Sequence, residues 1–189
     1  MINKWNFQTP SEEELHKRDQ LVAELGFSPV ICLLLVQRGI TSIEEAKKFF
    51  KPSLNDLHDP FLMPDMDKAV RRLNKALGNK EKILIYGDYD VDGTTAVSLV
   101  FKYLRPYSST LDFYIPDRYD EGYGISYKGI DYAAENGVSL VISLDCGIKA
   151  IEKIEYAKEK GIDFIICDHH MPDATLPDAV AVLDGKRSG

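Results

Sequence analysis

The sequence predicts an α/β fold in which a mostly parallel β-sheet is flanked by helices, with a helical region before it. After Gly78, short apolar runs alternate with amphipathic segments, a pattern typical of a parallel sheet covered by helices on both faces. Before Gly78, apolar residues recur at helical spacing. We therefore expect a helical region with a linker over residues 1–64 and an α/β domain over residues 65–189.

Three helices are predicted before residue 51. The first follows Thr9-Pro10-Ser11 and opens with three glutamates, and a hydroxyl followed by acids is typical of a helix N-terminus. The other two expected helices cover Val30–Val36 and Ile43–Phe50. Residues 51–64 contain three prolines and no clear period, which indicates a linker or a wrapped loop.

Helical spacing returns over Asp65–Leu77, and Gly78 is expected to end that helix. The apolar runs that follow are the expected strands: Ile83–Tyr86, Leu111–Ile115, Leu140–Leu144, Phe164–Cys167 and Val180–Leu183. The expected helices between them are Thr95–Leu104, Lys128–Asn136 and Lys149–Lys160. The last connection, residues 168–178, contains two prolines and is expected to be a loop.

Charged and imidazole side chains follow four of these strands. They are Asp88 after the first, Asp117 and Arg118 after the second, Asp145 after the third, and Asp168-His169-His170 after the fourth. In open α/β sheets, ligands bind outside the carboxyl ends of the strands. We therefore expect a functional site at this edge.

The stretch GDYDVDG places Asp88, Asp90 and Asp92 at alternate positions. A calcium loop of the EF-hand type is excluded, because its twelfth position is Leu99 and a strand-like run precedes it. A solvated turn is the simpler alternative, but three such close acids repel one another unless cations or donors compensate them. Carboxylate oxygens suit Mg²⁺ or Mn²⁺, and a nearby imidazole favours Mn²⁺.

The composition limits the possible classes of protein. The chain has 189 residues, a net charge of −7 and no apolar run long enough to cross a membrane, and it starts without a signal-peptide pattern, so we expect a cytoplasmic protein. Its three cysteines form no C-x-x-C pair, which favours reduced structural thiols. The acidic balance does not favour a stand-alone nucleic-acid binder.

The segments YGDYDVDGTTA, SLDCG and CDHH together resemble the DHH phosphoesterases. IPDRYDEGYGIS, RGITSIEEAKKFF and PSLNDLHDPFLMPDMDKAV resemble the RecJ branch of that family, which consists of single-strand-specific bacterial exonucleases. The resemblance extends from Leu33 to Lys186. It implies two divalent metal ions, usually Mn²⁺ with Mg²⁺ as an alternative, and cleavage of a phosphodiester by a metal-activated water.

The resemblance also implies roles for individual residues. Some family members carry a histidine where Tyr86 stands, and its absence here favours Asp88 as an additional ligand of the first metal. The implied set is Asp90 and Asp88 on the first metal, Asp92 and His169 on the second, Asp145 on both, and Asp168 and His170 orienting His169 and meeting the substrate phosphate.

Two further residues are candidates for substrate binding, beside His170. Arg118 suits a phosphate, with an ion pair to Asp117 or Asp120 as the alternative. Tyr123 suits stacking on a base, with simple packing among the tyrosines of its loop as the alternative.

The expected function is a 5′-to-3′ exonuclease specific for single-stranded DNA, acting in DNA repair and recombination, monomeric and without membrane attachment. A further metal-binding aspartate and a substrate-binding domain are expected beyond Gly189, so we expect this chain to bind Mn²⁺ weakly and to have little activity alone. The alternatives are another DHH hydrolase, acting on pyrophosphate, oligonucleotides or a cyclic dinucleotide, and a non-catalytic metal-binding α/β module. The segments RGITSIEEA and DLHDPF favour the exonuclease.

Overall fold

The computed structural model describes residues 9–187. The expectation that the chain starts without a signal peptide concerns mainly residues 1–8, which lie outside the described range. The chain forms two compact units, one ending at His58 and the other beginning at Asp59. The sequence places its division six residues later, at 64/65. Within the described range, no helix is long and apolar enough to cross a membrane.

The first unit contains three helices, α1 (Glu12–Leu25), α2 (Pro29–Val36) and α3 (Ile43–Phe50), as the sequence predicts. The serines before α1 and α3 each form a capping box with the glutamate three residues later, which satisfies backbone N–H groups at both helix starts. A small core of buried residues joins the helices: Leu21, Cys32, Leu35, Val36 and Ala46.

The second unit contains a five-stranded sheet in which every pairing is parallel, with strand order β2-β1-β3-β4-β5. This confirms the predicted fold class. The strands are β1 (Lys82–Gly87), β2 (Leu111–Tyr114), β3 (Val138–Leu144), β4 (Asp163–Cys167) and β5 (Ala181–Leu183). Strands β1 and β3 have almost continuous apolar sequences because both of their faces are buried.

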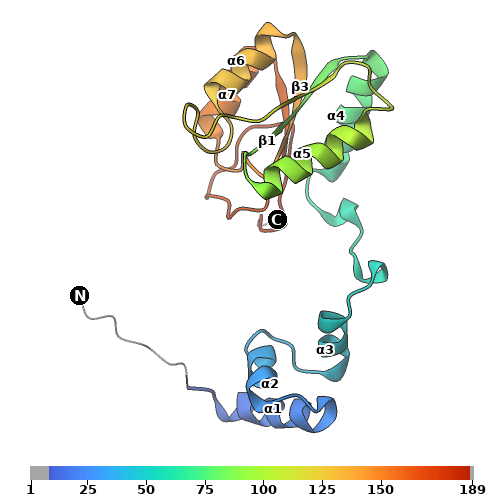
Figure 1. Cartoon of the computed structure of the whole chain (residues 1–189), viewed down its shortest axis with the longest axis vertical. Helices are drawn as coiled ribbons and strands as arrows, with labels where there is room; N and C mark the ends of the chain where they lie inside the picture. The colour runs from blue at the N-terminus through green and yellow to red at the C-terminus, as the bar shows by residue number, and fades with distance from the viewer. Residues whose placement is uncertain (1–8, 188–189) are drawn as a thin grey trace, which may run out of the picture. The chain divides into compact units, whose positions relative to one another are not determined.

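Helices cover both faces of the sheet (Figure 1). On one face, α4 (Met66–Asn79) and α5 (Val91–Leu104) pack against alternate residues of β1 and β3, among them Ile83 and Ile142. On the other face, α6 (Tyr127–Glu135) and α7 (Ile151–Glu159) pack against the intervening residues, such as Leu84 and Val141. The sheet therefore has two separate cores, one on each side.

Two predicted helix boundaries are wrong. Helix α4 continues through Gly78 to Asn79, and Lys80 ends it in a left-handed conformation with φ of 55°. Helix α5 begins at Val91 rather than near Thr95, because the Asp90 carboxylate caps it by accepting a hydrogen bond from the Gly93 N–H. The second difference matters for function, since it places GDYDVDG across the junction of β1 and α5.

The predicted linker over residues 51–64 contains two short 3-10 turns, η1 (Leu54–Asp56) and η2 (Pro60–Leu62). The loop expected after β4 is present, because residues 168–178 form no helix or strand. The three cysteines are free thiols.

Candidate metal centre

The topology brings the strand ends together. Strand β1 lies between β2 and β3, so the chain leaves β1 at the point where the strand order reverses, the usual ligand site of such sheets. The register aligns Gly87 with Leu144, and Leu144 with Cys167. The residues that follow these three, Asp88, Asp145 and Asp168, therefore emerge side by side.

Asp88 is fully buried at the end of β1. One carboxylate oxygen, Oδ1, accepts a hydrogen bond of 3.1 Å from the Gly124 N–H, and the other, Oδ2, is buried without a partner among the described residues. A buried carboxylate oxygen without a donor is costly, and a cation would satisfy it.

The loop after Asp88 is held tightly against the start of α5. Asp90 is exposed, with Oδ1 2.9 Å from the Gly93 nitrogen, and Asp92 lies in the first turn of α5. A Cβ atom at Gly93 would lie 2.5 Å from the carbonyl oxygen of Asp88, so only glycine fits there. The backbone that carries the three acids is thus fixed by packing.

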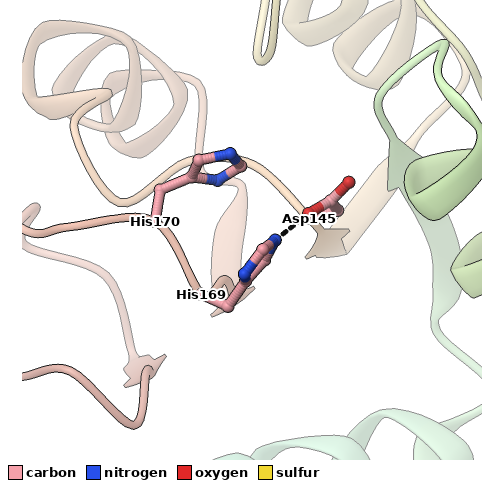
Figure 2. A group of neighbouring side chains, drawn as sticks. All are labelled: Asp145, His169 and His170. Carbon is pink, nitrogen blue, oxygen red and sulfur yellow. Dashed lines mark ion pairs between the residues drawn. The ribbon is translucent and has the colours of Figure 1, made fainter. Parts of the chain in front are cut away.

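Figure 2 shows Asp145, His169 and His170 converging at the ends of β3 and β4. A ligand atom from each lies within 4.8 Å of the others, and Nε2 of His169 is 2.9 Å from Oδ1 of Asp145. Burial raises the pKa of Asp145 and the charge of Asp90 adds to this, while His169 opposes it. Asp145 also has a positive φ of 62°, a conformation that Asp and Asn adopt more readily than most residues.

Asp168 shapes the turn that presents the two histidines. Its side chain is 1% exposed, its Oδ1 accepts the N–H groups of His169 (2.7 Å) and His170 (3.1 Å), and its Oδ2 accepts the Ile148 N–H (3.0 Å). Burial opposes ionisation of Asp168, but these donors outweigh it and lower its pKa. Oδ1 also lies 2.7 Å from Nδ1 of His170, so this carboxylate contacts the His170 ring and only the backbone of His169.

Asp92 completes one side of the site. It lines a cavity of about 510 Å³ together with Asp145 and His169. Met63 and Met66, which precede or begin α4, form part of the same cavity. All six predicted catalytic residues therefore lie at one edge of the sheet, although only Asp145, His169 and His170 form the tight cluster.

Tyr123 reaches this edge from the loop between β2 and α6. Its hydroxyl donates to the Asp145 carbonyl oxygen at 3.3 Å and lies 3.2 Å from Nε2 of His170. Burial, followed by the charges of Asp88 and Asp145, raises its pKa, so the hydroxyl keeps its proton. The expected packing among the loop tyrosines is wrong for Tyr119, which is 94% exposed.

Arg118 lies in the same loop, with its guanidinium 5.2 Å from the centre of the Tyr89 ring. The alternative of an ion pair is not seen among the described residues. The Asp117 carboxylate accepts the N–H groups of Tyr119 and Asp120 instead, and Asp120 lies 3.9 Å from the Lys128 ammonium. The guanidinium therefore has N–H groups available for a phosphate.

Sequence reasoning missed a buried polar network behind this loop. The Tyr86 hydroxyl donates to the Gly124 carbonyl at 3.1 Å and accepts the Ser126 N–H at 3.0 Å, and Gly124 in turn holds Asp88. Glu121 extends the network by accepting from the hydroxyls of Tyr114 and Ser126. Burial raises the pKa of Tyr86 and that of Tyr114, the latter to about 12. The only signal in the sequence is a tyrosine within the otherwise aliphatic β1.

The chain is similar to known proteins. The profile of the DHH family, N-terminal domain, matches residues 82–189. The single-stranded-DNA-specific exonuclease RecJ of Bacillus subtilis is 40% identical over 98% of this chain, and RecJ of Escherichia coli is 33% identical over 90%. The chain spans 23% and 29% of the lengths of these two relatives.

Solved structures show the same likeness. A crystal structure of exonuclease RecJ bound to manganese matches this chain with a TM-score of 0.61 and 28% identity. The match covers 68% of this chain and 33% of the RecJ chain. The structure of RecJ from Thermus thermophilus in complex with Mn²⁺ matches this chain with a TM-score of 0.64 and 25% identity. The match covers 90% of this chain and 23% of the Thermus chain. The fold, the strand-end residues and these matches together show that the chain belongs to the DHH family.

Proposed function

We propose that this chain carries the metal-binding part of a 5′-to-3′ exonuclease specific for single-stranded DNA, which hydrolyses phosphodiester bonds with two divalent ions during DNA repair and recombination. The observation that carries the proposal is the buried Oδ2 of Asp88, which has no partner among the described residues, at the same strand edge as the cluster of Asp145, His169 and His170. Mn²⁺ is favoured because the donors combine carboxylates with an imidazole. A monomeric, cytoplasmic protein is part of the same proposal.

We assign the donors to two such ions. Asp88 and Asp90 are proposed for the first, Asp92 and His169 for the second, and Asp145 for both. Divalent cations held there supply a nucleophile at neutral pH and offset charge on the attacking and leaving oxygens. Asp145 is central because it lies beside His169 and close enough to Asp90 for their charges to interact.

The remaining residues act on the substrate. Asp168 fixes the turn that presents His169 and His170, and does so through backbone N–H groups. We assign His170 to the substrate phosphate, and Tyr123, whose hydroxyl already donates to the Asp145 carbonyl oxygen, to stacking on a base. Arg118 offers a guanidinium for a second phosphate contact.

The similarity to RecJ proteins supports single-stranded DNA over smaller substrates, because it includes the first unit as well as the DHH-matched residues. Hydrolysis of pyrophosphate, short oligonucleotides or a cyclic dinucleotide is the alternative, since the same donor set would serve any phosphoester. A non-catalytic metal-binding module would need the acids but not His170, Tyr123 and Arg118 around them.

Calorimetric titration with Mn²⁺ tests the metal centre. The unaltered chain is expected to bind two ions weakly, and Asp145→Ala is expected to lose both. Asp131→Asn is the matched control, because Asp131 is an α6 acid that pairs with Lys160 on the helical face, away from the strand ends. Retention of two ions by Asp145→Ala would count decisively against the proposed bridging role.

The substrate is tested with 5′- and 3′-labelled single-stranded DNA, pyrophosphate and a cyclic dinucleotide, each with Mn²⁺. Slow release of nucleotides from the 5′ end is the expected result for this chain. Preferential hydrolysis of pyrophosphate or the cyclic dinucleotide would favour the second candidate. Release that starts at the 3′ end would exclude the proposed direction.

A further inference from the structure

A second cavity, of about 270 Å³, lies next to the metal centre. The side chains of Tyr123, Ile125 and Ile148 give it an apolar wall, and Lys149 and Lys153 also line it. His170 lines this cavity and belongs to the cluster with Asp145 and His169, and Asp168 lines both this cavity and the one beside Asp92, so the two cavities are neighbours. None of the roles proposed above uses either lysine.

The walls of this cavity are tied to the metal centre by fixed backbone. The N–H of Ile148 donates to Oδ2 of Asp168 at 3.0 Å. Gly147 has a φ of 114°, and a Cβ atom there would lie 2.9 Å from Cδ1 of Ile125, so the turn packs closely against the opposite wall. The space is therefore pre-formed, as small-molecule sites usually are.

Both lysines are available to an anion. Lys153 forms no ion pair among the described residues. Lys149 pairs with Asp173 at 3.1 Å, but both side chains are more than half exposed, so this ion pair is weak and an incoming anion can replace it. Helix α7 also begins at this wall without a side-chain cap on its first N–H groups. The nearby acids are mostly engaged: Asp168 accepts backbone N–H groups, and Glu121, which shares a neighbouring cavity with Lys153, accepts two hydroxyls.

An aromatic and aliphatic wall with two adjacent ammonium groups matches one class of ligand, a nucleotide. The apolar wall suits the face of a base, since stacking on an aromatic ring is independent of sequence. The lysines suit its phosphate. The 270 Å³ space is small for a drug-sized ligand but adequate for a single unit of a chain that continues into the metal centre.

We propose that this cavity is a subsite for one nucleotide of the single-stranded substrate, next to the phosphate held at the metal centre, with Lys149 and Lys153 binding its phosphate. The proposal rests on the proposed function for the identity of the substrate. Its physical basis is the cavity, which is separate from the metal ligands. Its failure can therefore be told apart from a failure of the metal centre.

Amide chemical shifts of the ¹⁵N-labelled chain, titrated with thymidine 5′-monophosphate in the presence of diamagnetic Mg²⁺, test the subsite. Shift changes are expected at residues 147–153 and 123–125. Thymidine alone and inorganic phosphate alone are expected to bind more weakly, because each makes only half of the contacts. The double variant Lys149→Ala/Lys153→Ala is expected to bind the nucleotide about tenfold more weakly or worse, the typical effect of losing charge-assisted hydrogen bonds.

Lys158→Ala is the matched control, because Lys158 lies on α7 but pairs with Asp178 and does not line this cavity. It is expected to bind like the unaltered chain, and circular dichroism verifies that all variants are folded. If no chemical-shift changes appear at about 20 mM nucleotide, the affinity is negligible and the proposed subsite is wrong. Shifts confined to other surfaces, or equal binding by the double variant, would also overturn it. Loss of Mn²⁺ binding in the calorimetric test bears only on the metal centre.

Discussion

The two ends of the sheet treat buried charge in opposite ways. At the amino end, Arg72 of α4 is 10% exposed and lies 2.6 Å from Asp163 and 2.7 Å from Glu81. At the carboxyl end, no lysine or arginine in the described range pairs with Asp88, Asp90, Asp92, Asp145 or Asp168, and the side chains that contact the carboxylates of the last two are histidines. The described part of the chain thus pairs its acids with an arginine at one end and leaves them without a lysine or arginine partner at the other.

This difference separates structural acids from functional ones. Both ends place carboxylates beside strands, and composition alone cannot distinguish them. Where the protein supplies the counter-charge, the acids join α4 to β1 and β4. Where it does not, the acids lower the folding stability, as expected of carboxylates kept for the proposed metal ions. Substitutions at the two ends should therefore have opposite effects on the metal-free chain.

The largest expected effect is at the amino end. Arg72→Met should lower the free energy of unfolding by about 2–4 kcal/mol, because it leaves the partly buried Glu81 and Asp163 without their arginine partner. Urea denaturation followed by circular dichroism measures the change. The adjacent Arg71→Met is the control, since Arg71 pairs with Asp67 on the exposed face of α4 and should cost about 0.5 kcal/mol or less. Equal effects of the two variants would contradict the comparison.

The same end should make stability depend on pH. Burial opposes ionisation of Glu81, but hydrogen bonds from Arg72, Ser139 and Asn79 outweigh it and lower its pKa in the folded state. A lowered carboxyl pKa gives stability that is present above the unfolded-state pKa of about 4.3 and is lost as the pH falls through the folded-state value. Denaturation midpoints measured from pH 6 downward should fall less steeply in Arg72→Met. A slope unchanged by the substitution would refute this assignment.

Tyr86→Phe should lower the free energy of unfolding by about 1–3 kcal/mol, because the Gly124 carbonyl and the Ser126 N–H lose a buried partner. It should also weaken Mn²⁺ binding, since Gly124 holds Asp88. Tyr103→Phe is the control, as Tyr103 is 68% exposed. Unchanged metal affinity in Tyr86→Phe would restrict this network to a structural role.

Asp145→Asn should act in the opposite direction, raising the free energy of unfolding of the metal-free chain by about 1 kcal/mol. It removes a buried charge that Asp90 repels, while asparagine tolerates the positive φ at this position. The measurement is chemical denaturation with a chelator present. Destabilisation by this variant would show that the carboxyl end is internally compensated after all.

Arg118→Ala should have the smallest effect on stability, about 0.5–1 kcal/mol, because it loses only the contact with the Tyr89 ring. Arg118→Lys keeps the positive charge but loses the planar guanidinium. It therefore distinguishes bidentate hydrogen bonding to a phosphate from electrostatic attraction alone. Thermal denaturation measures stability, and DNA binding at two salt concentrations measures the phosphate contact. A large loss of stability would mean that the Tyr89 contact has a structural role.

The parallel sheet and its functional edge could be predicted from the sequence because both depend on local patterns. Apolar runs locate the strands, and the acid that follows each run must emerge at the same edge when the strands are parallel. The start of α5 was misplaced because the cap at Asp90 is also a candidate ligand, and helical spacing alone does not reveal it. The predicted end of α4 at Gly78 was wrong because Lys80, and not Gly78, adopts the left-handed conformation that ends the helix.

Other features could not be predicted because they depend on segments far apart in sequence. The Tyr86 hydroxyl meets Gly124 and Ser126 across about 40 residues, and nothing in either segment alone indicates this contact. The cavity beside Lys153 forms only when the Gly147 turn packs on Ile125. The sequence pattern predicts that the acids lie at the carboxyl edge of the sheet, but it does not say which metal ion each acid binds. Those individual roles could be proposed only from the resemblance to the DHH phosphoesterases.

The close packing of Gly93 on Asp88 has a thermodynamic consequence. Since the backbone of this loop is immobilised by contact with α5, its conformational entropy is lost when the protein folds. Little further ordering is then needed when a cation arrives, so the entropy of association should be dominated by water released from the ion and the carboxylates. Isothermal titration of the unaltered chain with Mn²⁺ measures that entropy of association.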